Sequence, residues 1–311
     1  MQKQSLLIGL VLIVTLLAIF SLTGEEDKVT EIQEPLPTPM EDQIEIPDPF
    51  LLDALIKAGL DTNGDGFISY DEALARENLA INQANIENLE GLQYFTNLKL
   101  LCLEQNWIHN IEPLAELTQL ESLELKGNKI SDLTPLASLE QLTYLDLYSN
   151  RITDVSPLAR LINLENLNLN SNMLKDVSPL ASLTNLVELT LWENEIVDIS
   201  PLASLTHLKY LNLLYNQVSD ASPLAHLINL ERLNLSHNQI EIETVTPLAS
   251  LEHLNYLNLS DNEIEDITPL TDFIHLKTLS ISNNRITDFS PLDQLTELED
   301  IDSYSNPGSP N

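Results

Sequence analysis

The stretches 120-LESLELKGNKI-130 and 142-LTYLDLYSNRI-152 are two copies of one pattern, 22 residues apart, and they decide the fold. In each copy, leucine stands at positions 1, 4 and 6, asparagine at position 9 and isoleucine at position 11. The first leucine of the pattern recurs along the chain at Leu98, Leu120, Leu142, Leu164, Leu186, Leu208, Leu230, Leu254, Leu276 and Leu298. Only the step from Leu230 to Leu254 differs, because it takes 24 residues. A period sustained over ten copies indicates a stack of similar units.

Each position of the pattern has a physical role in such a stack. In the L-x-L core, successive residues face opposite sides of a short strand, so the leucines point inward together. The turn after the strand leaves interior backbone groups to be paired, and an asparagine amide offers both donors and an acceptor. The asparagines are Asn106, Asn128, Asn150, Asn172, Asn194, Asn216, Asn238, Asn262, Asn284 and Asn306. Period and pattern together predict a leucine-rich repeat solenoid.

The segments that return from one strand to the next are also regular, as in ISDLTPLASL (130–139) and ITDVSPLARL (152–161). Serine or threonine followed by proline is typical of a helix start, with the hydroxyl at the N-cap and proline at the first helical position. The predicted fold is therefore an α/β solenoid. It is a leucine-rich repeat arc with a parallel concave β-sheet, short 3₁₀ turns on the convex side and a small helical N-terminal cap.

The 22-residue unit with D-[LIV]-[ST]-P-L-A-x-L resembles the repeats of the bacterial internalin family over residues 76–306. The resemblance implies a protein that binds protein partners on its concave face. No immunoglobulin-like segment or wall-sorting motif follows the repeats, so attachment is expected at the N-terminus. No nucleophile elbow or glycine-rich phosphate loop is found either, and we expect no enzyme activity.

A calcium-loop motif precedes the repeats, at 61-DTNGDGFISYDE-72. It matches D-x-[DN]-x-[DN]-G-x₅-E at every position. The predicted calcium ligands are Asp61, Asn63, Asp65, the carbonyl of Phe67, Ser69 and Glu72. The single cysteine, Cys102, can form no disulfide within the chain, so we predict that calcium is a structural cofactor of the cap. The alternative is a turn rich in Asp, Asn and Gly that binds no metal.

The outward-facing strand positions are free of the repeat's packing constraints, and the chain's few aromatic residues gather there. The predicted ligand-binding residues are Tyr144, Tyr148, Trp192, Tyr210, Tyr215 and Tyr256. Tyrosine and tryptophan dominate binding hot spots, although aromatic residues also suit any exposed strand surface. The sequence thus predicts an adhesion or recognition module that binds a protein, with a glycan as the alternative ligand. A second hypothesis is a structural acidic envelope protein without one defined partner.

Charge and the N-terminus indicate where the protein acts. Lys plus Arg number 14 against 48 Asp plus Glu, a net charge of −34, which repels nucleic acid and anionic lipid. Lys3 precedes an apolar run and acids follow it, which favours export to the periplasm or the exterior. The predicted organisation is a signal peptide or membrane anchor (1–24), an acidic, proline-rich linker (25–48), the cap (49–97), the repeats (98–306) and a tail (307–311). Membrane contact is expected only through the first segment.

Overall fold

The computed structural model describes residues 42–309, all of which belong to one unit of the chain, residues 39–311. The predicted signal or anchor and most of the predicted linker lie outside the described residues. Between residues 42 and 309, no helix has the length and apolar character needed to cross a membrane.

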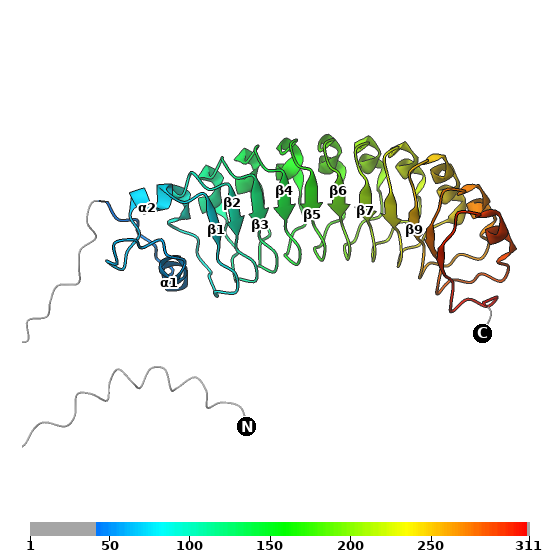
Figure 1. Ribbon diagram of the computed structural model, residues 1–311, viewed down its shortest axis with the longest axis horizontal. Helices are drawn as coiled ribbons and strands as arrows, with labels where there is room; N and C mark the ends of the chain where they lie inside the picture. The colour runs from blue at the N-terminus through cyan, green and yellow to red at the C-terminus, as the bar shows by residue number, and fades with distance from the viewer. Residues whose placement is uncertain (1–41, 310–311) are drawn as a thin grey trace, which may run out of the picture. The chain divides into compact units, whose positions relative to one another are not determined.

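The repeats of this unit build one parallel β-sheet, as predicted (Figure 1). In residues 42–309 the sheet has eleven strands that follow one another in chain order. They are β1 (Asn78–Ala80), β2 (Leu100–Cys102), β3 (Ser122–Glu124), β4 (Tyr144–Asp146), β5 (Asn166–Asn168), β6 (Glu188–Thr190), β7 (Tyr210–Asn212), β8 (Arg232–Asn234), β9 (Tyr256–Asn258), β10 (Thr278–Ser280) and β11 (Asp300–Asp302). Equivalent repeat positions pair with one another, so Leu145 lies beside Leu167 and Tyr144 beside Asn166. Side chains at one repeat position therefore form a column across the sheet.

Short 3₁₀ helices connect the strands and lie along the other side of each repeat (Figure 1). They are η1 (Leu92–Tyr94), η2 (Glu112–Glu116), η3 (Thr134–Ser138), η4 (Ser156–Arg160), η5 (Ser178–Ser182), η6 (Ser200–Ser204), η7 (Ser222–His226), η8 (Ile242–Ser250), η9 (Thr268–Asp272) and η10 (Ser290–Gln294). The longest, η8, lies in the 24-residue step between Leu230 and Leu254. The predicted leucine-rich repeat arc with 3₁₀ turns is confirmed.

The caps of these 3₁₀ helices differ from the prediction in one respect. The serine or threonine before proline is the first helical residue, and its hydroxyl does not cap the helix. The aspartate two residues earlier does so instead: Asp132 Oδ1 accepts a hydrogen bond from Thr134 N at 2.8 Å. The same bond recurs at Asp154, Asp176, Asp198, Asp220, Asp266 and Asp288. A carboxylate is the stronger acceptor because it is charged, which accounts for the recurrence of aspartate at this position.

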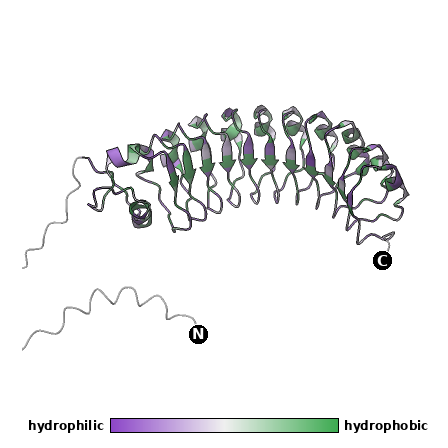
Figure 2. Ribbon diagram, viewed as in Figure 1, coloured by the Kyte–Doolittle hydropathy of each residue, from purple (hydrophilic) through white to green (hydrophobic). Residues whose placement is uncertain are grey.

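The leucines of the pattern form one continuous core that runs from the cap through the repeats. Figure 2 shows hydrophobic residues at matching places in successive repeats. The asparagine ladder closes the interior as predicted. Asn172 Nδ2 donates to the carbonyls of Leu147, Leu169 and Asn170 at 3.1 Å, and Asn172 Oδ1 accepts from Ile152 N at 3.0 Å. Each asparagine thereby joins its own repeat to the one before it.

The N-terminal cap contains two helices, α1 (Pro49–Lys57) and α2 (Tyr70–Leu74), with the 61–72 loop before and into α2. Residues 42–48, assigned by the sequence analysis to the end of the linker, lie against this cap. Ile44 N donates to Ile68 O at 2.8 Å and Tyr70 N donates to Asp42 O at 3.1 Å. These bonds form a short antiparallel bridge between the chain before α1 and the end of the loop.

Candidate functional site: the concave face and the 61–72 loop

Trp192 and Tyr148 form a stacked pair in the middle of the concave face. They occupy the same repeat position two repeats apart, yet their ring centroids are 6.0 Å apart with an interplanar angle of 14°. Asn170 occupies that position in the intervening repeat, and its Oδ1 accepts a hydrogen bond from Trp192 N at 2.7 Å. Lys126 Nζ lies 5.4 Å from the Tyr148 ring centroid. The two rings are nearly parallel, and together they form an aromatic surface that spans the intervening repeat.

Tyr210 and Tyr256 flank Arg232 on three adjacent strands. In register, Tyr210 pairs with Arg232 and Arg232 with Tyr256. The Arg232 guanidinium carbon lies 5.8 Å from the Tyr210 ring centroid and 4.8 Å from that of Tyr256. Arg232 was not among the predicted binding residues. Its place in the same column as the two tyrosines was the signal that could have revealed it.

The other two predicted aromatic residues have different surroundings. Tyr144 on β4 is 38% exposed, and burial together with the carboxylates of Asp146, Glu124 and Glu104 raises the pKa of its hydroxyl. Tyr215 lies in the turn after β7, in the left-handed backbone region with φ 53°. Its ring stacks on that of His237, with centroids 3.9 Å apart. Tyr215 therefore belongs to the edge of the concave face, whereas Tyr144 lies on the sheet itself.

Carboxylates crowd the first strands of the concave face. Burial raises the pKa of Glu104, and a hydrogen bond with Glu124 raises it further. Burial is also the main cause of the raised pKa of Asp146 on β4. The Cys102 thiol beside them is buried, and burial with the nearby Glu124 and Glu104 raises its pKa to about 12. A thiol with so high a pKa is protonated at neutral pH and is a poor nucleophile.

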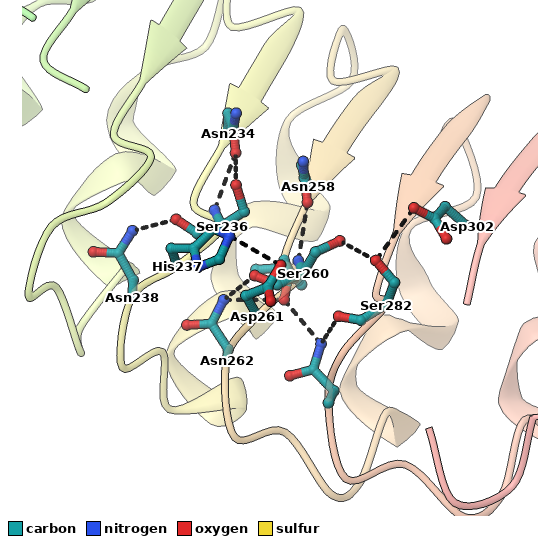
Figure 3. Close-up of polar contacts among 12 residues, drawn as sticks. Asn234, Ser236, His237, Asn238, Asn258, Ser260, Asp261, Asn262, Ser282 and Asp302 are labelled. Carbon is teal, nitrogen blue, oxygen red and sulfur yellow. Dashed lines mark hydrogen bonds and ion pairs between the residues drawn. The ribbon is translucent and has the colours of Figure 1, made fainter. Parts of the chain in front are cut away.

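Small polar side chains line the last strands of the concave face (Figure 3). Ser282 Oγ donates to Ser260 Oγ at 3.0 Å and also lies 3.2 Å from Asp302 Oδ2. His237 Nε2 lies 3.1 Å from Asp261 Oδ2 at the edge of the sheet. Within the described residues no serine hydroxyl is hydrogen-bonded to His237, so these groups do not form a nucleophile–base pair. The contacts instead tie neighbouring repeats together.

The 61–72 loop curls around its own acidic side chains. Asp61 Oδ2 accepts from Gly66 N at 3.0 Å, and Asp65 Oδ1 accepts from Phe67 N at 2.9 Å. Asn63 Oδ1 accepts from Asp65 N at 2.9 Å. Gly66 has a φ of +83°, a conformation that favours glycine, and it makes the sharp turn that the motif requires.

Glu72 joins the two ends of this loop. Its Oε1 accepts from Thr62 N and Thr62 Oγ1, both at 2.7 Å. Its Oε2 accepts from Ser69 N at 2.9 Å, and Ser69 Oγ caps α2 in return. Burial alone would raise the pKa of Glu72, but the hydrogen bonds from Ser69 and Thr62 outweigh it and lower the pKa to about 2. The carboxylate is therefore ionised across the physiological pH range.

The fit of the loop to calcium is partial in this structure. The six predicted ligands all present oxygen atoms, the donors that calcium takes. Between residues 42 and 309, however, no three or more His, Cys, Asp or Glu side chains are grouped so as to hold a metal. Three of the six ligands are neutral, namely Asn63, Ser69 and the Phe67 carbonyl, and Glu72 is directed at Thr62. A metal held by Glu72 Oε1 would compete with the two hydrogen bonds that this oxygen accepts from Thr62.

Comparisons with known proteins agree with this architecture. Residues 96–138, 140–182, 184–226 and 228–272 match a family model of two leucine-rich repeats, and residues 275–295 match a model of a single repeat. No curated protein sequence matches the chain significantly.

Solved structures of bacterial leucine-rich repeat proteins are similar to this chain. Internalin InlF of Listeria monocytogenes is 36% identical, with a TM-score of 0.79, over 84% of this chain and 76% of that one. Internalin C2 of the same organism is 31% identical, with a TM-score of 0.54, over 86% of this chain and all (100%) of that one. A leucine-rich repeat protein of Leptospira interrogans is 26% identical, with a TM-score of 0.65, over 76% and 68%. The chain therefore belongs to the leucine-rich repeat family and is a bacterial internalin-like protein.

Proposed function

We propose that this protein is a non-catalytic binding module that holds a protein partner on the concave face of its sheet. Leucine-rich repeat proteins generally act as recognition modules. The observation that carries the proposal for this chain is the aromatic surface of Tyr148 and Trp192, stacked across two repeats with centroids 6.0 Å apart. The protein acts outside the cytoplasm in this proposal, secreted or held at a membrane by its first 24 residues.

The composition of the concave face supports a protein partner. The inward repeat positions serve the core, so only outward positions are free to be selected for binding. Aromatic residues there give rigid, flat contact area with little loss of conformational entropy on binding. The indole Nε1 of Trp192 is buried and has no hydrogen-bond partner within the described residues. A buried donor without a partner is costly, and a small movement of the ring on binding would let an acceptor of the partner satisfy it.

Replacing Trp192 by alanine is the direct test of this site. We expect the affinity for the partner to fall by at least about 2 kcal/mol, as for a hot-spot residue. The melting temperature should change little, because the side chain lies outside the leucine core. Equal loss of binding and of folding would contradict the assignment of Trp192 to a binding face.

The partner itself can be sought by site-specific photocrosslinking on intact source cells. A photoreactive amino acid at Asn166, on the concave strand β5, is compared with one at Arg160, at the end of η4. We expect protein adducts from position 166 that disappear when Trp192→Ala is added, and no such adducts from position 160. The same adducts from both positions would refute a concave site, and carbohydrate adducts alone would favour the glycan alternative.

Calcium is proposed as the structural cofactor of the cap, held by Asp61, Asn63, Asp65, Phe67, Ser69 and Glu72. The support for it is the complete motif and the curled loop around Asp61, Asn63 and Asp65. When bound, the metal would supply two positive charges that offset most of the negative charge of Asp61, Asp65 and Glu72. Residues 42–44 hold the end of the loop in place, because they form backbone hydrogen bonds with Ile68 and Tyr70.

Titration calorimetry should therefore show calcium binding to the wild-type protein, with one ion per chain. At a calcium concentration 100 times the Kd, mass action stabilises the folded cap by about 2.7 kcal/mol and raises its melting temperature. The variant Asp65→Asn should lose both effects, and Glu140→Gln, an exposed acid in the repeats, should keep them. Absence of binding heat at millimolar calcium would exclude the site.

A further inference from the structure

Arg232 lies on the concave face between two tyrosine rings and, within the described residues, forms no ion pair with a carboxylate. Half of the lysines and arginines of the described residues form ion pairs with acids, namely Lys57, Lys99, Lys175, Lys209, Lys277 and Arg285. Glu231, the neighbour of Arg232 in sequence, is among these partners and pairs with Lys209 at 3.2 Å. Arg232 is exposed, and it differs from the other arginines of residues 42–309 in lying close to two aromatic rings.

Lys126, another cation of the concave face, has carboxylates near its charge. Lys126 lies over Tyr148, but the carboxylates of Glu104 and Asp146 are within range of its charge. Arg232 lies instead between two neutral rings, at 5.8 Å from Tyr210 and 4.8 Å from Tyr256. Glu188 on β6 occupies the same repeat position as Arg232, and Tyr210 on β7 lies between the two. Arg232 on β8 is therefore a concave-face cation in contact with two aromatic rings.

The two tyrosines determine which part of Arg232 a partner can reach. Aromatic rings attract a guanidinium through its positive charge and use none of its N–H donors. Held between Tyr210 and Tyr256, the side chain loses little further conformational entropy on binding. Its free N–H donors form a planar fork that matches the two oxygen atoms of a carboxylate. The arrangement is thus preorganised for a bidentate contact with an acidic group.

We propose that Arg232 is a specificity-determining residue that binds one acidic side chain, Asp or Glu, of the protein partner. The inference rests on the proposed function, because it assumes that a polypeptide lies on the concave face. The chain's net charge of −34 repels polyanions as a whole, so nucleic acid or a strongly acidic partner is disfavoured. The fitting partner is neutral or basic overall and places a single carboxylate at β8, two strands after β6, the strand that precedes Trp192.

Peptide display tests this inference with a defined probe. The folded full chain is immobilised and used to select from a random 12-residue peptide library, in parallel with the variants Arg232→Gln, Arg232→Lys, Arg160→Gln and Trp192→Ala. We expect wild-type selections to be enriched in Asp or Glu at one position. Arg232→Gln should lose this enrichment, and Arg160→Gln, an exposed arginine on η4 without a ring on either side, should retain it.

A selected peptide and its Glu→Gln (or Asp→Asn) counterpart then give a double-mutant cycle. The change in the peptide should weaken binding to the wild-type protein about 10- to 100-fold, the usual range for a hydrogen-bonded charge pair. It should have little effect on binding to Arg232→Gln. Arg232→Lys should recover part of the loss, because it keeps the charge but not the planar fork. Melting curves of the variants check that the fold is retained.

The outcomes separate the two proposals. Peptides whose binding needs Trp192 but shows no acidic preference would overturn the role of Arg232 and leave the concave site standing. An acidic preference that survives Arg232→Gln would overturn it as well. Selections that do not depend on Trp192, or that yield no peptide, would contradict the proposed function itself and the assignment of Arg232 with it.

Discussion

Replacing Asp48 by alanine is expected to destabilise the N-terminal cap by about 4 kcal/mol, the sum of a lost helix cap and a lost charged hydrogen-bond network. Asp48 is only 6% exposed. Its Oδ1 accepts from Phe50 N and Leu51 N at the start of α1, and its Oδ2 accepts from Glu87 N and Asn88 N before η1. One carboxylate thus holds the first helix to the first repeat, and its removal leaves four backbone donors without this acceptor.

Hydrogen exchange on the Asp48→Ala variant is the measurement that resolves this effect. Protection should be lost across about residues 42–95 and should fall off along the repeats, because each unit of a solenoid contacts only its neighbours. The control is Asp53→Ala on the same helix, whose carboxylate is exposed and pairs with Lys57 at 2.6 Å. An exposed pair of this kind contributes little, so the control should exchange like the wild type. Uniform loss of protection along the whole chain would contradict a local role.

Protonation of the Asp48 carboxylate is expected to lower the stability of the cap in acid. Burial alone would raise the pKa of Asp48, but the backbone hydrogen bonds from Asn88, Glu87, Leu51 and Phe50 outweigh it and lower the pKa below its ordinary value of 3.8. Because the pKa of Asp48 is lower in the folded state than in the unfolded state, its ionised carboxylate stabilises the cap at pH values above 3.8. This contribution to stability is lost as the pH falls below 3.8 and through the folded-state pKa. The difference in stability between wild type and Asp48→Ala should therefore narrow in that window.

Asn172→Ala is expected to lower the free energy of unfolding by about 3 kcal/mol, because a buried amide with four hydrogen bonds is removed from the middle of the solenoid. Its Nδ2 donates to three carbonyls and its Oδ1 accepts from Ile152 N. Alanine can replace none of these bonds, and Asn172 is only 8% exposed, so water has poor access to the groups left behind.

Urea denaturation measures this loss, with Asn185→Ala as the matched control. Asn185 is exposed, and its side chain makes one bond, from Nδ2 to Ile162 O at 2.9 Å. The control should change the free energy of unfolding by less than about 1 kcal/mol, the net value of a solvent-exposed hydrogen bond. Equal effects of the two substitutions would mean that water pairs the backbone groups around Asn172 and that the ladder is not essential.

The binding face was only partly predictable. The outward strand positions followed from the period, so Tyr144, Tyr148, Trp192, Tyr210 and Tyr256 could be assigned to the concave face from their repeat positions. The stack of Tyr148 on Trp192 and the position of Arg232 between two tyrosines could not, because they depend on how side chains lean across neighbouring strands. Asp48 was also missed, although Asp48-Pro49 before an apolar helical pattern is an N-cap signal.

The sequence by itself determined the solenoid, the strand positions, the leucine core and the asparagine ladder. It could do so because a repeat contacts chiefly its neighbours, so every structural requirement recurs at the same position and the period reveals it. Tertiary structure alone decided the contacts that occur once: the carboxylate of Asp48 between α1 and the first repeat, the pairing of residues 42–44 with the loop, and the surroundings of Arg232. Some of these contacts join residues that do not occupy equivalent positions in the repeats, and others depend on side-chain conformation. The spacing of residues along the chain encodes neither kind of contact.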